Sequence, residues 1–133
     1  MSALREVVDS ADETLRRHAL ADPPEGELAP RVDDPTRGFV LEAVREGSLL
    51  HYAEPRAFDD MDPDLRLLAG DSLYALGLAR LAEAGDLPAV AELADLISAC
   101  AQAESEGGRT GTGQLWEASV KALLRTQPGS PNR

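Results

Sequence analysis

The side chains in this chain that are best suited to chemistry are a few acids and two histidines. Asp60, Asp62, Asp64 and Asp71 fall at positions 1, 3, 5 and 12 of a calcium-binding loop. That loop needs glycine at its sixth position, where this chain has Leu65. We therefore interpret the cluster as acids at a helix N-terminus, which the helix dipole favours, and predict no metal site.

The histidines and the single cysteine do not form a ligand or nucleophile pattern. His18 and His51 are too far apart in sequence to share a helix face, and neither has a cysteine or aspartate at ligand spacing. Cys100 cannot form an internal disulfide, and we expect it to be an inert thiol buried in an apolar helix. No serine or cysteine has a recognisable base partner, so we predict no catalytic residue and no cofactor.

Asp71 is the acid whose surroundings are unusual. It lies about a third of the way into an apolar helical stretch, where an unpaired carboxylate would be costly, so we expect it to have a partner. The candidates are Arg45, Arg66 and the ring of His51. A structural ion pair is one interpretation, and a carboxylate that faces a pocket is the other. His51, Tyr52 and Asp71 are thus the candidate pocket or buried polar residues.

Composition places these residues in a helical protein. The chain has 133 residues, of which 43% are hydrophobic and only 4% aromatic, so leucine and alanine must form its core. This length fits a single domain, residues 1–133, that needs neither disulfides nor metal to fold. Because β-branched runs of strand length are missing, the sequence predicts an all-α fold.

Charge limits the partners that we expect. The net charge is −11, from 24 acidic and 13 basic side chains, and such a surface repels nucleic acid and anionic lipid. No stretch approaches the roughly 20 apolar residues of a membrane span, and the N-terminus lacks the layout of a signal peptide. Twelve of the basic residues are arginine, a bias typical of GC-rich bacterial genomes. We expect a soluble, cytoplasmic, bacterial protein.

Start and stop residues divide the chain into about five helices in a compact, mostly antiparallel bundle. Aspartate followed by proline begins two of them, and Gly85-Asp86 ends one helix and begins the next. A proline-rich, loose linker is expected at about 20–34, and a disordered tail from about 128. The expected helices span about 3–19, 35–53, 63–84, 87–104 and 113–127.

The helix expected at 63–84 is apolar around most of its circumference, which predicts a central helix covered on several sides. Gly70 and Gly77 lie near one face of it and, with Gly47 on the preceding helix, are candidates for close helix packing. Several half-covered leucine and alanine faces are too many for a thin monomer to bury. We therefore predict a two-fold homodimer with 35–53 and 63–84 at or near the interface.

Residues 48–51 (SLLH) and 67–71 (LLAGD) resemble the core helices of trans-polyprenyl diphosphate synthases. Residues 48–51 (SLLH) resemble the run that opens the first aspartate-rich magnesium site of that family. Residues 67–71 (LLAGD) resemble a run on its next long helix, and the resemblance covers roughly 38–104. Tyr52 and Ala53 stand where the family has the two aspartates that hold magnesium.

The resemblance implies a helical scaffold that has lost its catalytic residues. It is similar to the small, non-catalytic component of two-component prenyl synthases, which implies a subunit that acts through homo- or hetero-oligomerisation with a larger protein partner. A small protein that binds an apolar ligand such as an isoprenoid is the first alternative. An active prenyl diphosphate synthase is the second alternative. It is the least favoured because this chain lacks the family's lysine clamp, since its only lysine is Lys121.

Overall fold

A computed structural model describes residues 2–107 and 111–126 of the chain. Within these residues there are six α-helices, a short 3-10 helix and no β-strand, so the predicted all-α fold is confirmed. The tail predicted from about 128 lies outside the described residues. The helices are α1 (Ala3–Ser10), α2 (Glu13–Arg16), η1 (Ala29–Arg31), α3 (Pro35–Tyr52), α4 (Pro63–Glu83), α5 (Leu87–Ser105) and α6 (Gly113–Arg125).

Aspartate caps begin α3, α4 and α5 where the sequence predicts them. The side chains of Asp34, Asp62 and Asp86 each accept a hydrogen bond from the backbone amide three residues on, at 2.9, 2.8 and 3.4 Å. These bonds satisfy amides that have no partner inside the helix, and a proline lies in the first turn of each. Thr112, expected to cap α6, makes no capping side-chain bond.

The helix predicted over 3–19 is wrong as a single element. α1 ends at Ser10, and Ala11 has extended backbone angles. Asp12 then accepts hydrogen bonds from the amide and the hydroxyl of Thr14, at 2.9 and 2.7 Å, and so caps the short α2. Such local bonding to the following residues competes with continuation of a helix. The apolar spacing nevertheless continues through the break, because Leu15 is buried with α1.

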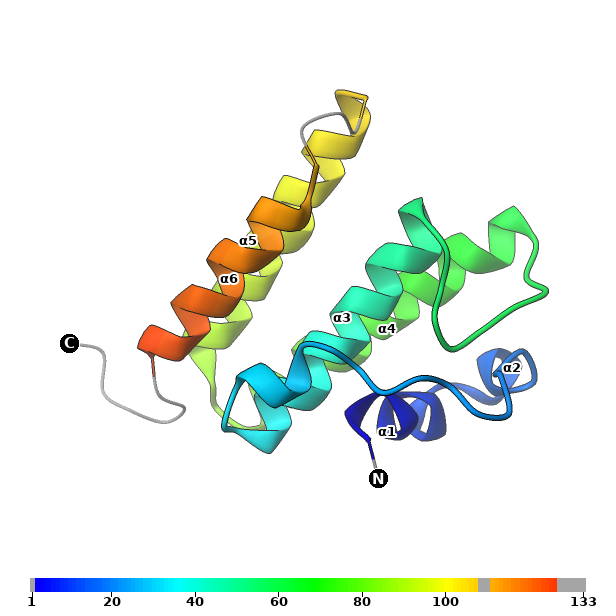
Figure 1. Ribbon diagram of the computed structural model, residues 1–133, viewed down its shortest axis with the longest axis horizontal. Helices are drawn as coiled ribbons and strands as arrows, with labels where there is room; N and C mark the ends of the chain where they lie inside the picture. Colours follow the sequence, from blue (N-terminus) through cyan, green and yellow to red (C-terminus); the bar gives the residue numbers. More distant parts are fainter. Residues whose placement is uncertain (1, 108–110, 127–133) are drawn as a thin grey trace.

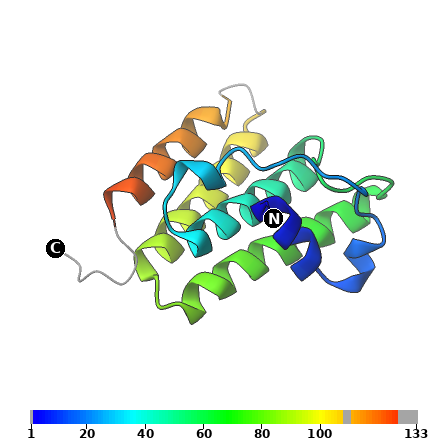
Figure 2. The same ribbon diagram turned by 60° about the horizontal axis from the view of Figure 1, so that its bottom comes forward.

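The four long helices form two layers. Figure 1 shows α3 and α6 towards the viewer, with α4 behind α3 and α5 behind α6. Successive helices run in alternating directions, and Gly85, at φ 72°, makes the tight turn between α4 and α5. Figure 2 shows α1 and the 20–34 segment passing across α3. That segment is not loose, because the amides of Leu28 and Ala29 each lie 2.8 Å from a side-chain oxygen of α3.

The central helix is α3 and not α4, so the prediction for 63–84 is wrong. Twelve of the 18 residues of α3 are buried, against five of the 21 residues of α4. α3 packs against α1, η1, α4 and α5, whereas α4 leaves Leu67 and Leu68 52% and 67% exposed. The apolar content of 63–84 predicts that α4 is the central helix. α3 takes that place because it buries charged side chains, which in the sequence look like surface residues.

Three glycines let α3 and α4 approach closely. A Cβ atom on Gly47 would lie 2.9 Å from the carbonyl oxygen of Gly70. One on Gly70 would lie 2.8 Å from the carbonyl oxygen of Gly47 and would overlap the ring of His51. One on Gly77 would lie 3.1 Å from a methyl group of Val40. The two helices therefore meet backbone to backbone at the pair Gly47 and Gly70.

Gly70→Ala should lower the free energy of unfolding by about 1–3 kcal/mol, because the new methyl group meets a backbone oxygen that cannot move away. This cost opposes a gain in helix propensity of about 1 kcal/mol. Gly113→Ala is the matched control, since a Cβ there has nothing within 4 Å. Urea unfolding of both variants measures the difference. A Gly70→Ala protein as stable as the control would contradict close packing at this crossing.

Candidate functional site

His51 and Asp71 meet where the end of α3 crosses the N-terminal half of α4. The Nε2 atom of His51 lies 3.0 Å from the carbonyl oxygen of Leu67 and 3.2 Å from Oδ1 of Asp71. A carbonyl oxygen only accepts, so Nε2 is assigned as the protonated nitrogen and donates to Leu67, while the Asp71 carboxylate lies within ion-pair distance. That nitrogen is therefore occupied as a donor and is not free to act as a base.

The structure corrects the burial expected for two of the three candidate polar residues. The side chain of His51 is only 11% exposed, but that of Asp71 is 70% exposed and Tyr52 is 38% exposed. Asp71 points outward because α4 turns other positions towards α3. Its partner is His51, which is one of the three partners expected from the sequence. Arg66 instead donates to three carbonyl groups at the end of α3, and Arg45 lies over Trp116.

Three weakly acidic side chains near this crossing all keep their protons. Burial raises the pKa of Tyr52, Tyr74 and Cys100 above the ordinary values of a phenol and a thiol. Cys100 is buried, as predicted, and the reactive form of a cysteine is the thiolate, which this environment disfavours. The crossing therefore offers a hydrogen-bonding surface and no activated nucleophile among these groups.

Residues 59–62 of the acidic segment line an open cleft of about 470 Å³ beside Glu54 and Arg66. One of its acids, Asp62, is committed to capping α4. Over residues 2–107 and 111–126, no three side chains of histidine, cysteine, aspartate or glutamate are grouped as a metal site would need. Asp62 therefore has the role at a helix N-terminus that the sequence predicts for this cluster.

α3 carries a buried ionic network that no motif in the sequence predicts. Arg56 donates to Glu46 at 3.0 Å and to Glu42 at 2.9 Å, and both glutamates are completely buried. The second oxygen of Glu42 accepts from the amides of residues 28–29, and that of Glu46 from the amides of 56–57, each at 2.8 Å. All four carboxylate oxygens are satisfied, so the network fastens two loops to α3 and leaves no oxygen for a ligand.

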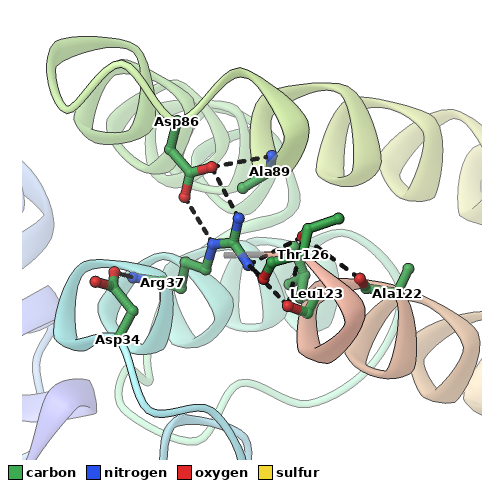
Figure 3. A network of polar contacts seen from close by, with 7 residues as sticks. All are labelled: Asp34, Arg37, Asp86, Ala89, Ala122, Leu123 and Thr126. Atoms are coloured by element: carbon green, nitrogen blue, oxygen red, sulfur yellow. Dashed lines mark hydrogen bonds and ion pairs between the residues drawn. The ribbon is translucent and has the colours of Figure 1, made fainter. Parts of the chain in front are cut away.

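A second buried network joins three helix ends (Figure 3). Arg37 donates to the two carboxylate oxygens of Asp86 at 2.6 and 2.9 Å, and to the carbonyl oxygens of Leu123 and Thr126 at 2.8 Å each. The side chains of Arg37 and Asp86 are only 3% and 2% exposed. Hydrogen bonds from Arg37 lower the pKa of Asp86, so the carboxylate stays charged at neutral pH. The network ties the starts of α3 and α5 to the end of α6.

Comparison with known proteins finds no significant similarity to any family model, curated protein or solved structure. The resemblance to prenyl synthases therefore stays a prediction. In the part of the chain that the structure describes, no helix combines the length and the hydropathy that crossing a membrane requires.

Arg37→Met should lower the free energy of unfolding by about 3–5 kcal/mol, because it leaves the Asp86 carboxylate buried without its cation. Arg31→Met is the matched control. Arg31 also pairs with a carboxylate through two bonds, to Glu117, but its side chain is 38% exposed. Exposed pairs contribute little, so the control should remain close to wild type in thermal and urea unfolding. Equal losses in both variants would contradict a structural role for the buried pair.

Proposed function

We propose that this protein is a non-catalytic helical subunit that associates with a second copy of itself through the outer faces of α4 and α5. The observation that carries the proposal is the exposed apolar surface of α4. Leu67 and Leu68 are 52% and 67% exposed, although large apolar side chains are normally covered when they lie side by side. The residues that follow on α4 extend this surface.

The exposed surface of α4 continues as a row of small side chains. Ala75, Ala79 and Ala82 are exposed and recur at helical spacing beyond Leu68. Alanines at these positions would let a second helix approach to about 8–10 Å between axes. The row and the two leucines thus form a surface suited to helix packing.

α5 adds a second exposed apolar row in the same layer. Leu87 is 68% exposed, and Ala91, Ala94 and Ala101 are exposed on the following turns. Figure 1 shows α4 and α5 together in the rear layer, behind α3 and α6. We call the exposed apolar residues of α4 and α5 the rear face. Its members are Leu67, Leu68, Ala75, Ala79, Ala82, Leu87, Ala91, Ala94 and Ala101.

Charge opposes contact between two copies, so the apolar area buried on the rear face must outweigh it. Two chains that each carry −11 repel one another, and Asp71, which is 70% exposed, lies on α4 between Leu67 and Ala75. A two-fold axis would place the rear face of one chain on that of the other. Of the two helices expected at the interface, α3 is buried over most of its length, so α4 is the one available.

Non-catalytic behaviour is supported by the crossing of α3 and α4. Tyr52 and Ala53 occupy the positions where the resemblance would require magnesium-binding aspartates, and both are exposed. Neither supplies the carboxylate oxygens that magnesium prefers. The first alternative, an isoprenoid-binding protein, has less support because charged side chains such as Glu54, Arg56 and Arg66 line the clefts beside this end of α3.

Leu68→Glu should weaken the homodimer at least tenfold, because it places carboxylates near one another across the two-fold axis. Leu124→Glu is the matched control, since Leu124 is an exposed leucine on α6, outside the rear face. Light scattering coupled to size exclusion, over a dilution series, measures the dissociation constant for both variants. Circular dichroism checks that each remains folded.

A wild-type protein that is monomeric at tens of micromolar would contradict the homodimer. If Leu124→Glu dissociates the dimer as strongly as Leu68→Glu does, the rear face is not the interface. A monomer that binds a larger protein through Leu68 would replace the second copy with a different partner.

The purified protein should not condense isopentenyl diphosphate with an allylic diphosphate, with or without magnesium. Magnesium should also leave the melting temperature unchanged, because a ligand stabilises a protein only by binding its folded state. The double change of Tyr52 and Ala53 to aspartate should not restore activity, since the lysine clamp of the family is still missing. Product above that of a heat-killed sample would contradict the non-catalytic proposal.

A further inference from the structure

A cleft between α3, η1 and the start of α6 has a different character from the rear face. It has a volume of about 550 Å³, which is large enough for a small organic molecule. Apolar and cationic side chains share its walls. The residues that matter for its chemistry are Leu28, Arg31, Arg45, Leu49, Arg56 and Trp116.

Two of the three arginines in this cleft are already neutralised. Arg31 makes two bonds to Glu117, at 2.7 and 2.9 Å. Arg56 is held by the buried glutamates of α3. Arg45, in contrast, makes no hydrogen bond or ion pair with any residue that the structure describes, and its guanidinium lies 5.2 Å from the centre of the Trp116 ring. Arg45 thus brings a positive charge and free donors to the cleft.

The surroundings of Arg45 make an unpaired charge unfavourable. Burial, and to a smaller extent the nearby charge of Arg56, lower the pKa of Arg45, while Glu27 and Glu42 act in the opposite direction. Contact with an aromatic face compensates a cation only in part, by about 0.5–2 kcal/mol. An anion that reaches the guanidinium from the cleft would supply the hydrogen-bond acceptors that Arg45 lacks among the described residues.

Trp116 lines the same wall of the cleft. The residue is only 5% exposed, and its indole Nε1 has no hydrogen-bond acceptor among the described residues. A buried donor without an acceptor costs about 1–3 kcal/mol, which native structures usually avoid. The start of α6 adds to the positive character, since Gly113 lines the cleft and the helix has no side-chain cap there.

We propose that this cleft binds a small molecule with one carboxylate and an apolar body. The carboxylate pairs with the guanidinium of Arg45, and the apolar body rests on Leu28 and Leu49. A single negative charge fits better than a diphosphate, because Glu27 and Glu54 also line the cleft and repel multiply charged anions. The cleft involves α3 and α6, so binding is independent of the rear face and of the proposed homodimer.

Trp116 is the only tryptophan in the chain, so its fluorescence reports on this cleft alone. Titration of the full-length protein with sodium benzoate should change the fluorescence with a saturable curve and a Kd on the order of 1 mM or tighter. Benzamide has nearly the same shape without the charge and should bind at least tenfold more weakly. Inorganic phosphate tests whether the site accepts any anion, and it should not displace benzoate.

Arg45→Gln should weaken benzoate binding about tenfold, because it removes the charge-assisted bonds to the carboxylate. Arg80→Gln is the matched control, since its guanidinium lies 4.5 Å over the ring of Phe39, outside the cleft. Arg45→Lys keeps the charge but loses the planar fork, and should bind with intermediate affinity. Thermal melting of each variant verifies that it is folded.

Three results would overturn the proposal. The first is benzamide binding as tight as benzoate binding, which would remove the role of the charge. The second is unchanged affinity in the Arg45→Gln protein, or an equal loss in the Arg80→Gln protein. The third is displacement of benzoate by phosphate at similar concentration, which would show a general anion site in place of a carboxylate site.

Discussion

The rest of the structure depends on the need to neutralise the charged side chains that α3 buries. Glu42, Glu46 and Arg37 lie on the helix that forms the centre of the protein, and each is at most 3% exposed. A buried charge is tolerated only with partners, and every partner here comes from another part of the chain. The 20–34 segment, the loop after α3, the start of α5 and the end of α6 are all held against α3 in this way.

This arrangement decides which surfaces remain available for function. α3 is covered by charged contacts and by its close crossing with α4, whereas the outer sides of α4 and α5 expose Leu67, Leu68 and Leu87. The proposed homodimer would cover this rear face. The Arg45 cleft lies beside the same network, in which Arg56 pairs with Glu42 and Glu46 while Arg45 makes no ion pair with a described residue.

The candidate residues are better suited to hydrogen bonding with a partner or ligand than to catalysis. His51 uses Nε2 as a donor, while burial raises the pKa of Tyr52, Tyr74 and Cys100, so that these groups stay neutral. Groups held in their protonated forms can orient a partner or a ligand through hydrogen bonds, but they supply no nucleophile. A binding or assembly role therefore agrees with both the rear face and the cleft.

The sequence by itself determined the helices whose signals are local. Asp34, Asp62 and Asp86 cap them through bonds that span three residues, and proline positions and apolar spacing mark their extents. Only the tertiary structure decided that α3 is central, that Asp71 is exposed, and that Arg37 meets a carboxylate 49 positions away. Such choices depend on which surfaces meet after the chain folds, and a buried glutamate or arginine has the same letter as an exposed one.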